Sequence, residues 1–164
     1  MDSIRFESAP LRTATQRVER AWIDYNGHMN VAYYTLAFDR ALDDIYDMLG
    51  IGPKLVTSAR MGPMALQTQI HYVNELLEDA PFACDFVMLD ADHKRVHCFL
   101  SMIALETGLL AATYETLSIN VDLEARRSAP YPEAVRARVA ALAGAHAGLE
   151  RPEQVGRTIG IRRR

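Results

Sequence analysis

Hydrophobic side chains recur at spacings of three and four residues between positions 31 and 49. The series consists of Val31, Tyr34, Phe38, Ala41, Ile45 and Met48. The opposite side of a helix drawn over this segment holds Arg40, Asp43, Asp44 and Asp47. This pattern predicts an amphipathic helix of about five turns. Gly50 and the Gly52-Pro53 pair are expected to end it.

Alternating hydrophobic and polar residues predict strands on both sides of this helix. A first strand is expected over residues 13–22, where Val18 and Trp22 fall on one side. A second is expected within residues 64–76. One face of that strand would hold Met64, Leu66, Ile70 and Tyr72, and the other Gln67, Gln69 and His71.

Three further strands are expected over residues 81–90, 95–105 and 109–122. The segment "DADHK" between the first two reads as a hairpin connection. The run at 95–105 is apolar on both sides, which is typical of a central strand covered on both faces. Residues 133–147 predict a second helix with Val135, Val139 and Leu142 turned inward.

The order of these elements predicts an α+β hotdog fold, in which a curved antiparallel sheet of about five strands wraps around one long helix. We expect a single domain over residues 1–164, with a core at about 12–122 and a C-terminal helical tail at about 131–164. One short tail helix cannot cover the second face of such a sheet. A homodimer, or a tetramer built as a dimer of dimers, is therefore expected.

Composition and charge exclude several classes of protein. The net charge is −3 and basic residues are scattered, so nucleic-acid binding is not expected. No apolar run reaches about 18 residues, so no membrane span is expected. The N-terminal segment lacks an apolar signal core, which favours a cytoplasmic protein with Cys84 and Cys98 as reduced packing residues. The final arginines, Arg162, Arg163 and Arg164, read as a solvated tail or as phosphate ligands.

The segment "DYNGHMN", residues 24–30, places polar groups directly before the long helix. Asn30 suits a helix cap and Asp24 suits an Asx turn, so the segment could be purely structural. Alternatively, a carboxylate beside a helix N-terminus could do chemistry on a polarised carbonyl. His28 would then act in proton transfer or orient the loop. Gly27 does not stand at the glycine position of a calcium loop, and the histidines show no metal-ligand spacing, so no metal is expected.

This segment resembles the Asp-x-x-Gly-His-x-Asn signature of hotdog-fold acyl-CoA thioesterases of the 4-hydroxybenzoyl-CoA thioesterase-like group. The resemblance implies hydrolysis of an acyl-CoA thioester without a cofactor, coenzyme A being part of the substrate. It implies Asp24 as general base or nucleophile, with the amides near His28 and Met29 polarising the carbonyl. Gly27 would let the substrate approach closely, and Asn30 would fix the loop. The chain departs from many members in having Trp22 and Val31 where they have an acidic residue and a second asparagine.

Three later segments, "DADHKRVHCF", "ATYETLSINVD" and "RPEQVGRTIGI", are similar to the betainyl-CoA thioesterases of carnitine degradation. That family's acyl group is a trimethylammonium cation, which aromatic faces bind well. The candidates for this contact are Trp22, Tyr25, Tyr33 and Tyr34, although each could also be a core residue. Lys94, Arg95 and His97 are candidates for binding a CoA phosphate.

Two strand carboxylates and two other activities remain as alternatives. Glu75 and Glu115 lie in strand-like segments, and Glu115 could be a second catalytic group or an exposed edge residue. A hotdog hydratase or dehydratase would pair an acid with a histidine, as Asp24 and His28 loosely do. A non-catalytic acyl-CoA-binding protein would keep the fold without turnover.

Overall fold

The computed structural model describes residues 6–161, and its long helix coincides with the predicted one. Helix α1 spans Val31–Leu49 and ends at Gly50, whose positive φ of 74° is the left-handed conformation that glycine adopts readily. Two side chains of the predicted apolar stripe, Val31 and Met48, are exposed. The buried stripe is wider than predicted, because it also takes in Ala37, Leu42, Tyr46 and Leu49.

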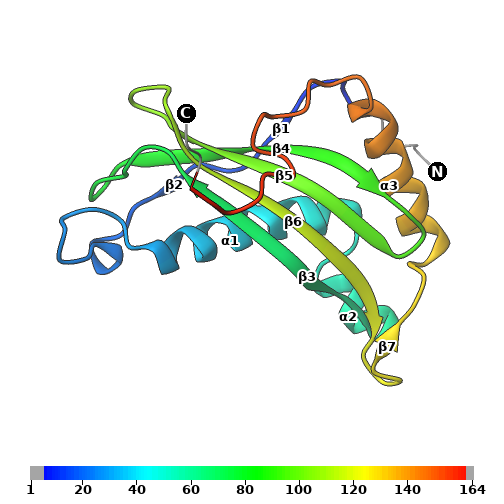
Figure 1. Ribbon diagram of the computed structural model, residues 1–164. Helices are drawn as coiled ribbons and strands as arrows, with labels where there is room; N and C mark the ends of the chain where they lie inside the picture. Colours follow the sequence, from blue (N-terminus) through cyan, green and yellow to red (C-terminus); the bar gives the residue numbers. More distant parts are fainter. Residues whose placement is uncertain (1–5, 162–164) are drawn as a thin grey trace.

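An antiparallel sheet curves around α1, with β5 at its centre (Figure 1). The long strands are β3 (Met61–Tyr72), β4 (Pro81–Ala91), β5 (Arg95–Ala104) and β6 (Leu110–Asp122). The strand order is β1-β4-β5-β6-β3, so β3 forms a free edge. Short strands β1 (Leu11–Arg12) and β2 (Gln16–Arg17) pair with β4, and β7 (Arg127–Ser128) pairs with β6. The α+β hotdog architecture and the central position of residues 95–105 are confirmed.

The first predicted strand, over residues 13–22, is not continuous. The Cys84 amide donates to the side-chain oxygen of Thr13, 3.1 Å away, so a hydroxyl takes the place of a backbone carbonyl and interrupts the ladder between β1 and β2. After β2 the chain turns into a short 3-10 helix, Arg20–Trp22. The alternation in the sequence therefore predicted the burial of Val18 and Trp22 correctly, but it did not predict the break in the strand or the 3-10 helix.

The predicted faces of β3 are wrong because of a β-bulge between Ala65 and Gln67. Met64 lies opposite Ile119, whereas Ile70 lies opposite Tyr114, and these two residues of β6 point to opposite faces. Met64 and Ile70 therefore do not share a face. The sequence also did not reveal the short helix α2 (Pro53–Ala59), which Pro53 begins at a position where proline is well tolerated.

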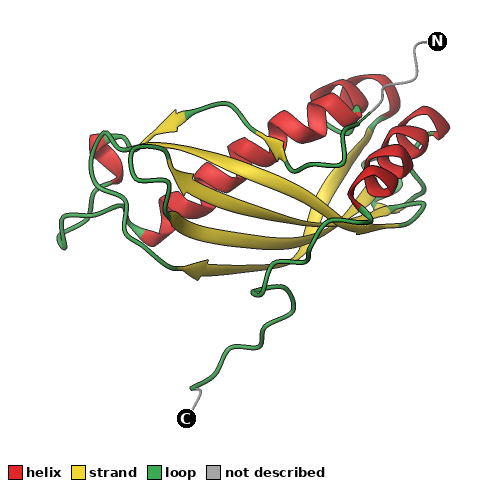
Figure 2. Ribbon diagram, turned by 90° about the horizontal axis from the view of Figure 1, so that it is seen from above, coloured by secondary structure: helices red, strands yellow, loops and turns green. Residues whose placement is uncertain are grey.

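The C-terminal helix α3 (Glu133–His146) agrees with the prediction, and Val135, Val139 and Leu142 are buried. His146 at its end is buried too, and its Nδ1 accepts a hydrogen bond from the Met88 amide at 2.9 Å. Viewed from above, α3 lies beside one end of the sheet while α1 runs under its length (Figure 2). No helix in residues 6–161 is long and apolar enough to cross a membrane.

Candidate active site at the start of the long helix

Residues 23–30 form a tight loop that delivers the chain into α1. Ile23 and Met29 make an isolated antiparallel bridge, and the Asp24 amide donates to the His28 carbonyl at 3.0 Å. Gly27 sits at the tip with a φ of +84°, and a side chain placed there would meet nothing within 4 Å. The loop therefore needs glycine for its backbone conformation and leaves open space beside it.

The Asp24 carboxylate lies within this loop and is only 10% exposed. Its Oδ1 accepts the Asn26 amide at 2.8 Å, which is the Asx turn that the sequence allowed. Its Oδ2 lies 4.0 Å from Nδ1 of His28. One carboxylate oxygen is thus fixed by the backbone, and the second faces a half-exposed imidazole.

His28 has its ring oriented by a backbone carbonyl. Its Nδ1 lies 3.2 Å from the Met29 carbonyl oxygen, which can only accept, so Nδ1 carries the proton. Nε2 is then the nitrogen left for a substrate or a water molecule. This arrangement fits either an orienting or a proton-transfer role for His28.

Asn30 caps α1, and its side-chain oxygen accepts the Ala32 amide at 3.0 Å. The expectation for the Met29 amide is wrong, because it donates to the Leu76 carbonyl at 2.8 Å and Met29 is buried. For the His28 amide, no acceptor lies among residues 6–161. The donors left to polarise a carbonyl are thus the His28 amide and the positive end of the helix.

The predicted aromatic cluster of four rings separates: two of them stack on each other, and the other two lie apart from that pair. Trp22 is buried and stacks on Tyr33, with ring centroids 5.5 Å apart, and the Arg40 guanidinium lies 5.3 Å from its ring. Tyr33 and Arg40 are two helical turns apart, about 10.5 Å, so the indole lies between them. Tyr25, by contrast, is 96% exposed.

Tyr34 turns away from Trp22 and toward the sheet. It packs edge-on against Tyr72, with centroids 5.2 Å apart, and Tyr72 is itself half-exposed. Burial raises the pKa of Tyr34, a hydrogen bond with the Leu76 backbone opposes this, and the charge of Glu75 adds to the rise. The β3–β4 loop therefore lies against the first turn of α1.

A cavity of about 490 Å³ opens beside this loop. It is lined by residues 74–81 together with Ala104, Glu106, Thr107 and Leu109. Its lining includes the carboxylates Glu75, Glu78, Asp79 and Glu106 and no Lys or Arg. The sequence analysis placed Glu75 in a strand, but β3 ends at Tyr72 and Glu75 lies in the loop. It missed Tyr72 and the other acidic residues of this cavity, because the β-bulge hid the direction of Tyr72 and the loop has no periodic pattern.

Lys94, Arg95 and His97 lie far from the loop of residues 23–30 that holds Asp24. The loop of residues 23–30 contacts Leu76, close to the end of the sheet where β5 finishes, whereas Arg95 begins β5. Nine strand residues separate those ends, or about 30 Å. Each side chain is also engaged: Lys94 with Ser128, Arg95 with Asp92 at 2.6 Å, and His97 with Glu115 at 2.8 Å. One copy of the chain therefore does not bring these residues to Asp24.

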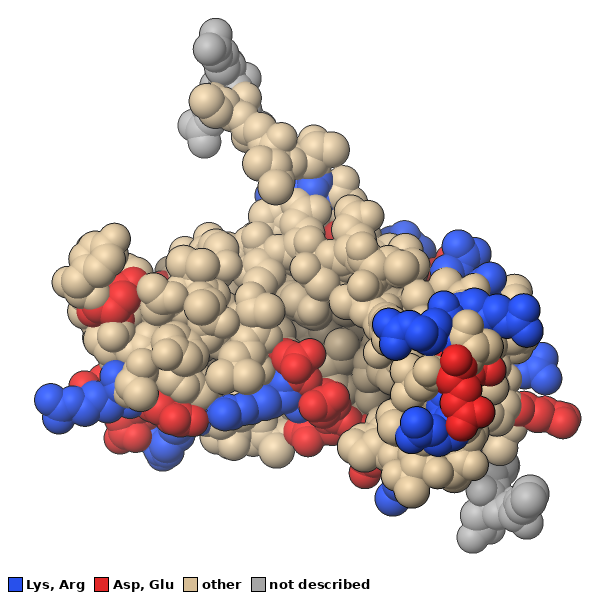
Figure 3. Space-filling model, turned by 90° about the horizontal axis from the view of Figure 1, so that it is seen from below, with Lys and Arg blue, Asp and Glu red and all other residues tan. Residues whose placement is uncertain are grey.

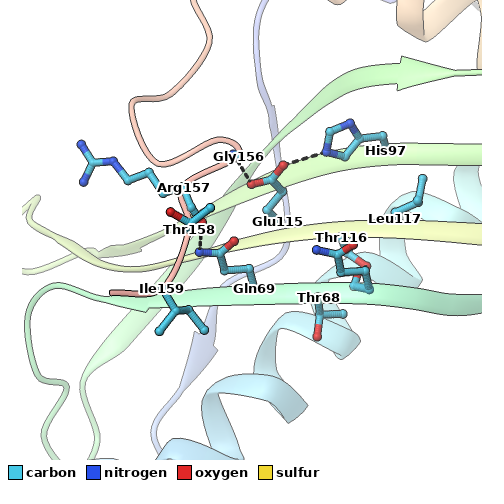
Figure 4. A pocket seen from close by; sticks show the side chains of 11 residues that line it. Thr68, Gln69, His97, Glu115, Thr116, Leu117, Gly156, Arg157, Thr158 and Ile159 are labelled. Carbon is cyan, nitrogen blue, oxygen red and sulfur yellow. Dashed lines mark hydrogen bonds and ion pairs between the residues drawn. The ribbon is translucent and has the colours of Figure 1, made fainter. Parts of the chain in front are cut away.

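Glu115 is not an exposed edge group. Its carboxylate accepts the Gly156 amide at 2.7 Å as well as contacting His97, and both contacts lie on the sheet face opposite α1 (Figure 4). No group of three His, Cys, Asp or Glu side chains suited to a metal occurs within residues 6–161. The candidate chemistry in this copy thus rests on Asp24, His28 and the start of α1.

Comparison with known proteins agrees with this fold and motif. A family model of the Thioesterase-like superfamily matches residues 18–139. A betainyl-CoA thioesterase from Pseudomonas aeruginosa is 34% identical over 94% of this chain and 97% of its own length. An L-carnitine dehydrogenase/betainyl-CoA thioesterase from Rhizobium meliloti is 31% identical over 95% of this chain, which spans 31% of that protein's length.

A solved structure of a Staphylococcus aureus protein in complex with CoA superimposes with a TM-score of 0.87 and 28% identity. The match covers 94% of this chain and 98% of that one. The chain therefore belongs to the Thioesterase-like superfamily and is a hotdog-fold thioester hydrolase.

Proposed function

We propose that this enzyme hydrolyses a small acyl-CoA thioester, with betainyl-CoA as its preferred substrate and Asp24 as the reacting carboxylate. The observation that supports this most is the placement of Asp24. Its carboxylate is nearly buried, has one oxygen held by the Asn26 amide, and lies in the loop that opens α1. A carboxylate fixed in this way needs little reorganisation to react.

In the reaction, Asp24 Oδ2 either takes a proton from the attacking water or attacks the thioester carbon itself. In the second case, water then hydrolyses the resulting anhydride. In both cases the C–S bond breaks, the sulfur leaves as CoA thiolate, and the carboxylic acid is released. The His28 amide and the N-terminus of α1 stabilise the negative charge that develops on the carbonyl oxygen.

The substrate preference is supported by the surroundings of the loop as well as by the named relatives. A trimethylammonium group accepts no hydrogen bonds and donates none, so aromatic faces and nearby negative charge are what attract it. Tyr72 offers a half-exposed ring beside Tyr34, and Glu75 lies in the acid-lined cavity next to them. Trp22 and Tyr33 face each other and serve as support for the loop.

We also propose that the active form is a homodimer in which the β3 edges of two copies pair antiparallel. The twelve residues of β3 contain no Lys, Arg, Asp or Glu, and Met64, Leu66 and Tyr72 are about half exposed. A long, uncharged edge strand is a template for pairing with another strand. Pairing near the middle of β3 would bring the partner's Lys94 and Arg95 to the Asp24 end, where they could bind CoA phosphates.

The decisive comparison is between betainyl-CoA and 3,3-dimethylbutanoyl-CoA, in which carbon replaces the quaternary nitrogen. The two acyl groups have the same shape and differ only in charge. We expect kcat/KM for thiol release to be at least about tenfold higher for betainyl-CoA. Equal or faster turnover of the neutral analogue would overturn the substrate assignment and leave the hydrolase assignment intact.

Glu75→Gln provides the matched variant, because it removes one charge and preserves the side-chain volume. We expect it to lower kcat/KM for betainyl-CoA and to leave turnover of the neutral analogue nearly unchanged. A parallel loss for both substrates would instead mean that Glu75 supports the loop structure.

A further inference from the structure

The C-terminal tail, residues 147–161, crosses the face of the sheet that lies opposite α1, here called the outer face. Hydrogen bonds hold it there, and two of them are seen in Figure 4: the Gly156 amide donates to Glu115, and the Gln69 side-chain amide donates to the Arg157 carbonyl. The tail and the strands enclose a cavity of about 500 Å³. Val87 and Phe99 are buried but lie outside the main core, as expected for side chains under this tail.

Beyond Arg157 the tail leaves its own sheet across β3. Thr158 and Ile159 lie beside Gln69 and His71 of β3, and the tail then projects past that edge (Figure 2). Ile159 is 96% exposed and Ile161 is 89% exposed. Figure 3 shows the tail leaving the molecule on a side with few charged residues. An anchored segment thus presents two almost fully exposed isoleucines beyond the edge of its own sheet.

The edge that the tail crosses is the edge proposed above to pair with a second copy. A two-fold axis perpendicular to a sheet keeps the outer faces of both copies on the same side. The tail would therefore continue onto the outer face of the second copy. The first apolar side chains it meets there are Met64, about half exposed, and the half-buried Leu117 and Ile119.

We propose that residues 158–161 of each copy bind the outer face of the second copy. Ile159 and Ile161 pack on Met64, Leu117 and Ile119 of that copy. This exchange rests on the proposed β3 dimer, and it adds a second, apolar contact that the strand pairing alone does not supply.

Disulfide trapping between two differently labelled copies tests the path directly. One copy has Ile161→Cys and the other Met64→Cys, so a disulfide between them can form only across the dimer. Cys84 and Cys98 are buried and do not compete. We expect a trapped heterodimer under mild oxidation. The control pairs Ile161→Cys with Leu109→Cys, which is similarly exposed but lies at the opposite end of the sheet from Met64, and should give none.

Sedimentation of wild type and of a chain ending at Arg157 separates the tail from the strand pairing. We expect the truncated chain to keep the circular-dichroism spectrum of the folded wild type, and its dimer dissociation constant to rise on the order of 100-fold. An unchanged dissociation constant without a trapped disulfide would overturn the tail exchange while the β3 dimer stands. A wild type that is monomeric at all concentrations would overturn both.

Discussion

Replacing Asn30 by alanine tests whether this residue acts on the fold or on the substrate. The side chain makes one hydrogen bond, from the Ala32 amide at 3.0 Å, and the Asn30 backbone amide separately donates to the Trp22 carbonyl at 2.9 Å. The substitution removes only the first. Loss of such a cap costs about 1 kcal/mol, which lowers the Tm of a chain of this size by about 2–4 °C.

The activity of the same variant should fall modestly, because the loop that holds Asp24 loses one of its attachments to α1. Asn30→Ser is the matched control, since serine also caps helices. Thermal unfolding and thiol release measured together should show both properties recovered in Asn30→Ser. A serine variant that is as stable as wild type and as inactive as Asn30→Ala would refute a purely structural role.

Three further predictions concern other parts of the chain. Gly50→Ala should destabilise by about 1–3 kcal/mol in urea unfolding, because the left-handed backbone disfavours a side chain and the new methyl group meets the Arg138 guanidinium; Gly144→Ala, in open space within α3, should stabilise slightly. Burial raises the pKa of the Cys84 thiol to about 12, so a thiol reagent at pH 8 should react only after unfolding. Burial is the largest single influence on the pKa of the Asp92 carboxyl and raises it, but the Lys94 and Arg95 amides and the Arg95 guanidinium together lower this pKa to about 2. Asp92→Asn should therefore be less stable than wild type above about pH 4, and the difference should vanish as the pH falls through about 2.

The elements with a regular period were predicted best. The long helix follows from the spacing between Tyr34 and Ile45, and the central strand from apolar residues on both of its sides. The β-bulge between Ala65 and Gln67 could not be recognised in the sequence. One extra residue turns the following side chains to the other face of the sheet without requiring a particular residue type. Short pieces such as α2 contain too few residues to show a period.

The candidate site was predicted in part. Asp24, His28 and Asn30 are neighbours in sequence, so their local motif predicts their proximity, and the structure adds which oxygen and which nitrogen remain free. Contacts between distant segments were not visible. They depend on how strands and loops meet in three dimensions. Examples are the hydrogen bond from the Met29 amide to the Leu76 carbonyl, the packing of Tyr34 on Tyr72, and the contact of His97 with Glu115.

Asp24→Asn gives the most direct measurement of whether this carboxylate performs the hydrolysis. Asparagine keeps the oxygen that accepts the Asn26 amide, so the loop and the Tm should be preserved. We predict that thiol release from betainyl-CoA falls about 10²–10⁴-fold in this variant, the range expected for loss of a catalytic acid–base group. Turnover within a few-fold of wild type in the folded variant would contradict the account.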